Sequence, residues 1–157
     1  MEDLMHLANI HDYLIQEYIV DAREYTLDCY VSQEGEILCA VPRIRIEVMG
    51  GEATKTETVR IPELEKLGHK VLNSFNFRGP VTLQFLYDPA TSRYLLMEIN
   101  PRLGGGVICS IAAGANICDF ILMEASGIKP EACTGWKPNT LMTRYWEEVI
   151  FQNGTKI

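Results

Sequence analysis

Two apolar runs on either side of a polar hexapeptide constrain this chain more than any other feature. The runs are residues 82–87 and 94–100, and residues 88–93 between them contain Asp, Pro and Ser. This pattern is typical of a β-hairpin with a longer loop. Symmetric folding about Thr91 would place Tyr87 opposite Leu95, Phe85 opposite Met97 and Gln84 opposite Glu98.

The predicted hairpin carries polar side chains on one of its faces. Alternation along the strands assigns to this face Gln84, Leu86, Leu96, Glu98 and Asn100. Two amide oxygens and one carboxylate would then lie close together, and such hard oxygen ligands suit Mg²⁺. The alternative is an ordinary solvated sheet face, which antiparallel sheets often have.

The residues that follow the hairpin favour the first reading. Asn100, Pro101 and Arg102 end the second strand, and three glycines at 104–106 precede an apolar run from Val107. Glycines let backbone amides approach a ligand closely. An arginine can form a two-pronged contact with phosphate or carboxylate oxygens.

Gln84 together with Met-Glu-Ile-Asn-Pro-Arg at 97–102 resembles the metal and phosphate motif of ATP-grasp enzymes, in particular the carbamoyl-phosphate synthase large subunit and biotin-carboxylase-like ligases. The resemblance implies that Gln84, Glu98 and Asn100 contact Mg²⁺ or Mn²⁺. It implies that Arg102 steadies a phosphate or acyl-phosphate oxygen. It also places Leu86 as the floor under an adenine ring.

A second part of the resemblance lies near the N-terminus. In ATP-grasp enzymes a Glu-x-hydrophobic segment holds the adenine by backbone groups, and a Glu seven residues later approaches the ribose. Glu17 and Glu24 have this spacing. The resemblance therefore implies that Glu17 and the backbone of Tyr18 and Ile19 meet the adenine edge. Glu24 would accept a hydrogen bond from a ribose hydroxyl.

Composition narrows the classes of function. The 157 residues are 47% hydrophobic, so one domain with a real core is expected. The net charge of −7 argues against nucleic-acid binding, which needs a basic surface. Five cysteines without Cys-x-x-Cys spacing argue against zinc and for free thiols. The apolar stretch 107–123 is interrupted by polar residues, and the N-terminus is not a signal peptide. We therefore expect a cytoplasmic protein without a membrane span.

The rest of the chain predicts further strands and helices. Arginines at 43 and 45 alternate along one strand, where they either form a surface charge ladder or supply positive charge to a phosphate-binding cleft. The expected elements are strands over 13–20, 24–31 and 37–48, a mobile loop over 49–57, a helix over 61–75, a helix over 107–127 softened at Gly114, and a last strand over 141–151.

The sequence thus predicts an α+β fold, with a mostly antiparallel sheet flanked by helices, that corresponds to the C-terminal lobe of an ATP-grasp fold. Residues 1–12 would be the tail of a lid subdomain and residues 13–157 the lobe, so we expect a fragment of a larger catalytic unit. The resemblance implies the ATP- and Mg²⁺-binding half of a carboxylate-amine ligase of the carbamoyl-phosphate synthase type, which forms an acyl phosphate.

Such a half lacks the lobe that closes over the phosphates, so we expect little ligase activity from it alone. A partner chain would supply the missing N-terminal lobe, and an exposed face left by that lobe would favour self-association. One alternative is a non-catalytic nucleotide-binding or assembly module that works only with a partner chain. Another is a plain structural domain with a coincidental polar hairpin.

Overall fold

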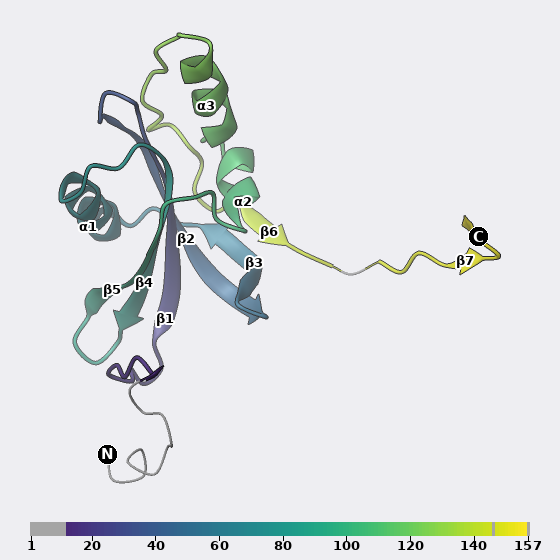
Figure 1. Cartoon of the computed structure of the whole chain (residues 1–157). Coiled ribbons are helices and arrows are strands. Elements are labelled where there is room, and N and C mark those ends of the chain that lie inside the picture. Colours follow the sequence, from purple (N-terminus) through teal and green to yellow (C-terminus); the bar gives the residue numbers. More distant parts are fainter. Residues whose placement is uncertain (1–11, 146, 157) are drawn as a thin grey trace.

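A single antiparallel sheet forms the centre of the computed structural model, which describes residues 12–145 and 147–156. Its strand order is β5-β4-β1-β2-β3-β6, and each neighbouring pair is antiparallel. Helix α1 lies on one side of the sheet, and α2 and α3 lie on the other (Figure 1). The predicted fold class is confirmed. The elements are β1 (Arg23–Val31), β2 (Ile37–Met49), β3 (Glu52–Thr58), α1 (Pro62–Asn73), β4 (Gly79–Asp88), β5 (Arg93–Asn100), α2 (Val107–Ala112), α3 (Ile117–Ala125), β6 (Leu141–Thr143), β7 (Phe151–Gln152) and β8 (Thr155–Lys156).

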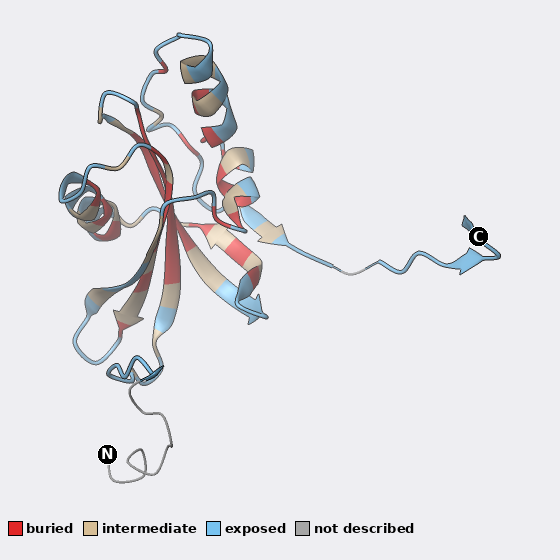
Figure 2. Ribbon diagram, in the orientation of Figure 1, coloured by how far each residue is buried: buried red, intermediate tan, exposed pale blue. Residues whose placement is uncertain are grey.

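Apolar side chains are buried on both faces of the sheet. On the α1 face, Leu27 and Leu83 from the central strands pack with Leu64 of the helix. On the opposite face, Tyr30 packs with Phe120 of α3, and separate contacts join the sheet to the segment around residue 136. Burial is concentrated in the middle of the sheet, and β5, β6 and the chain beyond β6 are largely exposed (Figure 2). The central strands β1, β2 and β4 therefore provide the rigid part of the scaffold.

Most of the expected elements are confirmed. The strand over 24–31 is β1, the long run over 37–48 is β2, and the helix that begins at Pro62 is α1. The helix over 107–127 is divided into α2 and α3, because Gly114 adopts a φ of +107° that ends the first helix.

The hairpin forms, and its predicted register is correct at the polar end only. Gln84 lies opposite Glu98 as expected, but Tyr87 lies opposite Tyr94 rather than Leu95. A β-bulge at Met97 adds one residue to β5 and shifts the pairing beyond it. Leu96 therefore lies opposite Phe85, on the face toward α1, and it does not share the face of Gln84 as the sequence predicted.

Three expectations were wrong. Residues 13–19 form no strand, and their side chains are mostly exposed, because a β-rich sequence needs a neighbouring strand to pair with. Residues 52–58 form a strand instead of a mobile loop, because Gly50 and Gly51, both with positive φ, make a tight turn that returns the chain along β2. The strand expected over 141–151 forms only as β6 and at Phe151, where β7 begins, and residues 144, 145 and 147–150 are not strand.

The lid tail expected over residues 1–12 lies, except for Asp12, outside the described residues. Within the described part of the chain, no helix is long and apolar enough to cross a bilayer. The five cysteines are free thiols, and burial raises the pKa of Cys29, Cys39 and Cys109 above the ordinary value.

Candidate functional site

The polar face of the hairpin is the starting point of the site. Gln84 lies opposite Glu98, and its Nε2 donates a 2.8 Å hydrogen bond to the Glu98 carboxylate. Asn100 lies two residues further along β5, opposite Thr82. Residues that face each other on paired strands project to the same side of the sheet. The structure therefore brings the three predicted metal ligands to one face, and Glu98 remains exposed to solvent.

The donor set fits a hard divalent cation after one rotation. Gln84 turns its amide nitrogen to Glu98, and its Oε1 accepts a hydrogen bond from Arg45 at 3.3 Å. A cation held between Gln84 and Glu98 would require the Gln84 amide to turn about half a revolution, so that its oxygen replaces its nitrogen. In the described residues no cluster of three His, Cys, Asp or Glu side chains exists, so the oxygen ligands would be one carboxylate and two amides.

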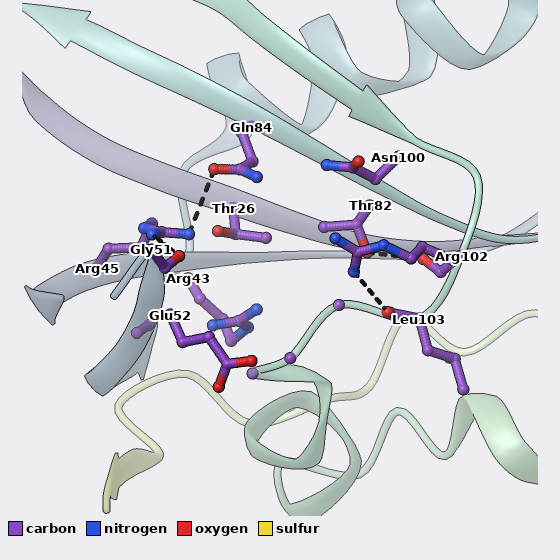
Figure 3. Close-up of a pocket in the computed structure, with 14 residues that line it drawn as sticks. Thr26, Arg43, Arg45, Gly51, Glu52, Thr82, Gln84, Asn100, Arg102 and Leu103 are labelled. Atoms are coloured by element: carbon purple, nitrogen blue, oxygen red, sulfur yellow. Dashed lines mark hydrogen bonds between the residues drawn. The ribbon is translucent and has the colours of Figure 1, made fainter. Parts of the chain in front are cut away.

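A pocket of about 280 Å³ begins at Gln84 and Asn100 and extends across the sheet. Figure 3 shows its lining, to which β1, β2, β4, β5 and the loop after β5 contribute. Three of the lining residues are arginines, at positions 43, 45 and 102. Glu52 is the single carboxylate in the lining, and it is paired with Arg144. Because Arg43 and Arg45 are each paired with a carboxylate, Arg102 is the lining arginine whose charge is free, among the described residues, to meet an anion.

Arg43 and Arg45 lie at this pocket and not on a surface charge ladder. Arg45 is ion-paired with Glu24 at 2.9 Å, and it donates hydrogen bonds to Gln84 and to the carbonyl of Gly51. Its side chain is 10% exposed. These contacts fix its guanidinium at the pocket wall, between the hairpin and the β2–β3 turn.

Arg43 forms a fully buried ion pair below the pocket. Its Nε lies 2.6 Å from Asp28 Oδ2, and its Nη1 donates to Thr56 Oγ1 at 2.9 Å. Ser110 of α2 donates a further hydrogen bond to Asp28. Burial opposes the charge of Arg43, but the charge and hydrogen bonds of Asp28 outweigh it, so the pKa of Arg43 is raised above its ordinary value.

The loop of three glycines at 104–106, here called the glycine loop, packs directly on this ion pair. A Cβ on Gly106 would lie 2.5 Å from Arg43 Nη1, and a Cβ on Gly104 would lie 2.9 Å from Thr82 Oγ1. Thr82 in turn donates a hydrogen bond to the carbonyl of Arg102. The loop that carries Arg102 is therefore shaped by the buried groups below it, which explains why glycines occupy these positions.

Three buried polar atoms in the pocket lining form no hydrogen bond with the described residues, and one of them, Arg45 Nε, lies 2.9 Å from the Glu24 carboxylate, which leaves two without any partner. Thr26 is 3% exposed, and its Oγ1 forms no hydrogen bond within the described part of the chain; the same holds for Nδ2 of Asn100. A buried polar group without a partner costs about 1–3 kcal/mol. Two such groups in one pocket can be satisfied by a bound water or by a ligand.

Two of the residues expected to hold the nucleoside, Glu24 and Leu86, lie at one end of the same face. Glu24 of β1 lies opposite Leu86 of β4, and the next row inward is Thr26 opposite Gln84. Glu24 uses its Oε2 for the pair with Arg45. Residues 17–19 lie in the irregular segment before β1, where Tyr18 is 85% exposed. Their roles remain predictions.

The sequence reasoning missed Thr26, Asp28 and Glu52. Thr26 and Asp28 follow Glu24 at alternate positions of β1, so the period of the strand places all three on one face. That pattern could have identified them, because polar residues on a central strand need a buried partner or a ligand. Glu52 carried no such signal, since its place depends on the turn at Gly50 and Gly51.

Comparison with known proteins gives a consistent result. The model of a protein family described as "ATP-grasp in the biosynthetic pathway with Ter operon" matches residues 9–147. The carbamoyl phosphate synthase large chain of Thermotoga sp. (strain RQ2) is 25% identical over 129 residues, which cover 75% of this chain and 12% of that protein. Acetyl-CoA carboxylase 2 of Arabidopsis thaliana is 32% identical over 66 residues, which are 41% of this chain and 3% of that protein.

Solved structures share the fold. The N5-carboxyaminoimidazole synthetase of Staphylococcus aureus, complexed with ADP, superposes with a TM-score of 0.63 at 21% identity over 74% of this chain and 33% of that one. The biotin carboxylase of Campylobacter jejuni superposes with a TM-score of 0.65 at 17% identity over 80% of this chain and 30% of that one. The chain thus corresponds to a minor part of each longer relative.

Proposed function

The chain belongs to the ATP-grasp family, and on this premise we propose that it is the nucleotide- and Mg²⁺-binding part of an ATP-dependent ligase that joins a carboxylate to an amine. One observation carries the proposal. Glu24 with Leu86, Thr26 with Gln84, and Glu98 with Asn100 lie on one face of adjacent strands and lead into a pocket with an excess of arginines. A nucleotide laid along this face would place its phosphates at the pocket.

Two transfers make up the proposed reaction. A carboxylate oxygen attacks the γ-phosphorus of ATP, the bond to the β-phosphate oxygen breaks, and ADP leaves. The amine nitrogen then attacks the carbonyl carbon of the acyl phosphate and expels phosphate, and the amine proton is released. A bound Mg²⁺ would offset the negative charge on the phosphate oxygens.

The side chains of this chain would bind and orient the reactants. Gln84, Glu98 and Asn100 would hold the Mg²⁺ once the Gln84 amide has turned its oxygen toward Glu98. Within the described part of the chain, the Arg102 side chain donates a hydrogen bond only to the carbonyl of Leu103, and it forms no ion pair. Its guanidinium is therefore available for a phosphoryl or acyl-phosphate oxygen.

The nucleoside end would lie on the outer part of the same face. Leu86 would form the floor under the adenine, and the backbone of Tyr18 and Ile19 with Glu17 would meet its edge. Glu24 would accept a hydrogen bond from a ribose hydroxyl while its other oxygen pairs with Arg45.

Turnover is proposed to need a further lobe that closes over the nucleotide, since the matched segment is 12% of the carbamoyl phosphate synthase large chain. Closing a site excludes water and strengthens the electrostatic interactions inside it. A partner chain that supplies such a lobe would therefore raise activity from a low level. Nucleotide binding without turnover, even in the presence of that lobe, would instead favour a non-catalytic binding module.

Calorimetric titration of ATP into the purified chain, with and without Mg²⁺, tests the proposal. We expect binding that depends on Mg²⁺ and that weakens at least about tenfold in Glu98→Ala, because one charged ligand is lost. Glu63→Ala is the matched control, since Glu63 is an exposed carboxylate on α1, on the other side of the sheet. ATP affinity that is indifferent to both Mg²⁺ and Glu98 would show the proposal to be wrong.

A further inference from the structure

We infer that Gln84 is a switch that links cation binding to Arg45. With its nitrogen bonded to Glu98, the Gln84 amide holds Arg45 through its oxygen; a cation bound between Gln84 and Glu98 turns the amide and releases Arg45 to an anion in the pocket. The inference rests on the proposed function and goes beyond it, because it makes the pocket selective for a nucleotide that carries its divalent cation over the metal-free nucleotide.

Four side chains from four strands form one polar chain across this face of the sheet. Glu98 of β5 accepts a 2.8 Å hydrogen bond from Nε2 of Gln84 on β4. Oε1 of Gln84 in turn accepts a 3.3 Å hydrogen bond from Nη1 of Arg45 on β2, which Figure 3 marks with a dashed line. Arg45 Nε lies 2.9 Å from Oε2 of Glu24 on β1. A change at the Glu98 end of the chain is therefore transmitted to Arg45 through groups in direct contact.

The two neighbours of Gln84 fix the direction in which its amide points. A carboxylate only accepts hydrogen bonds, and a guanidinium only donates them. The amide therefore turns its nitrogen to Glu98 and its oxygen to Arg45. The opposite orientation would set oxygen against oxygen at Glu98 and N–H against N–H at Arg45. Arg45 thus helps to keep the Gln84 oxygen away from the place where a cation would bind.

A cation between Gln84 and Glu98 would reverse this arrangement. The cation needs the amide oxygen, so the amide nitrogen comes to face Arg45. Two donors then oppose each other, and Arg45 Nη1 loses its acceptor. The other contacts of Arg45, with Glu24 and with the carbonyl of Gly51, keep its guanidinium at the pocket wall. Nη1 can then donate to a phosphate oxygen, and cation binding and anion binding strengthen each other.

Arg102 lines the same pocket but is not part of this chain of contacts. Its side chain donates to the carbonyl of Leu103, and among the described residues it forms no hydrogen bond or ion pair with Gln84 or Glu98. Its charge is therefore available to an anion with or without a bound cation. The two arginines provide an internal comparison, in which Arg102 recognises both forms of the nucleotide and Arg45 only the form that carries a cation.

Calorimetric titration of ADP into the full chain, in EDTA and in Mg²⁺, tests the switch. We expect Arg45→Met to weaken Mg-ADP binding about tenfold, since one hydrogen bond to a charged group is lost, and to change metal-free ADP binding by less than about twofold. Arg102→Met should weaken both forms. Arg23→Met is the matched control, because Arg23 is an exposed arginine of β1 outside the pocket lining. Equal weakening of both forms in Arg45→Met, or no weakening of either, would overturn the inference.

A double variant separates the switch from a simple loss of charge. In Gln84→Glu the carboxylate offers one oxygen to Arg45 and one to a cation, so Arg45 stays held when the cation binds. Adding Arg45→Met in this background should weaken Mg-ADP binding no more than metal-free ADP binding. If the added substitution still weakens Mg-ADP binding selectively, Gln84 does not control Arg45.

Mn²⁺ titration followed by electron paramagnetic resonance gives a readout without nucleotide. Arg45 competes with the cation for the Gln84 oxygen, so Arg45→Met should raise Mn²⁺ affinity more than Arg102→Met, which removes the same charge from the same pocket. Equal Mn²⁺ affinities in the two variants would contradict the switch. A larger rise in Arg45→Met, with no binding of ADP in either form, would refute the proposed function and leave the switch. Failure of both Mn²⁺ and ADP to bind would refute both.

Discussion

The two faces of strands β1 and β4 carry different kinds of side chain. Toward α1 these strands present Leu27 and Leu83, both fully buried among other apolar side chains. Toward the pocket the same strands present Thr26, Asp28 and Gln84. Apolar burial needs only shape and area, whereas each buried polar group needs a partner. The face toward α1 therefore stabilises the fold, whereas the face toward the pocket carries polar groups that can bind a ligand.

Among changes on the pocket face, breaking the buried ion pair should cause the largest loss of stability. Asp28→Ala leaves the Arg43 guanidinium buried and uncompensated, so we expect the free energy of unfolding to fall by about 3–5 kcal/mol. Urea denaturation measures it. The double variant Asp28→Leu with Arg43→Met removes both charges and should recover most of the loss. If the double variant does not recover the lost stability, the ion pair stabilises the fold by more than the mutual neutralisation of its two charges.

On the α1 face, a cavity substitution of comparable size should leave binding intact. Leu83 is fully buried, so Leu83→Ala should lower the free energy of unfolding by about 2–5 kcal/mol. Under conditions where the variant is folded, Mg-ATP affinity should match that of the unchanged protein. A drop in affinity measured by calorimetry would show that packing on the α1 face is coupled to binding on the pocket face.

A substitution in the glycine loop tests whether this loop packs on the ion pair of Arg43 and Asp28. Gly106→Ala would force a Cβ to within 2.5 Å of Arg43, so we expect a loss of about 1–3 kcal/mol in stability and weaker Mg-ATP binding. Gly105→Ala is the control, because its Cβ would meet Glu52 at an ordinary 3.5 Å. Thermal unfolding and calorimetry distinguish the two variants. Similar behaviour of both would mean that the loop does not rest on the ion pair.

The smallest expected effect concerns Tyr30, which holds α3 to the sheet on the pocket face. Its hydroxyl donates a 2.7 Å hydrogen bond to Glu124, and burial together with this carboxylate raises the pKa of Tyr30 from 10.0 to about 12. Between these values the folded protein keeps a proton that the unfolded chain loses, so stability should fall as the pH rises from 10 to 12. Tyr30→Phe should flatten that decline in denaturation measurements, and an unchanged slope would contradict it.

The hairpin shows which part of the strand pairing could be predicted from the sequence. Alternation and loop length predicted that Gln84 faces Glu98, and this is correct because the inserted residue Met97, between this pair and the loop, brings the pairing into the predicted register. Between the bulge and the loop the predicted pairing was wrong by one residue, because no local signal marked Met97 as an inserted residue. The segment over 13–19 shows the reverse case. Its residues have strand propensity, but pairing depends on neighbours that sequence alone does not place.

The sequence by itself determined the class of this protein: the spaced Gln, Glu, Asn and Arg residues identified the ATP-grasp resemblance, and strand alternation put three of them on one face. Only the tertiary structure decided what lies beside them. Pairing between strands far apart in the sequence brings β1 and β2, with Thr26, Arg43 and Arg45, to the side of Gln84. The Gly104–Gly106 loop likewise contacts Arg43, which is distant in the sequence. Local pattern fixes which way a side chain points, whereas the order of strands in the sheet fixes its neighbours.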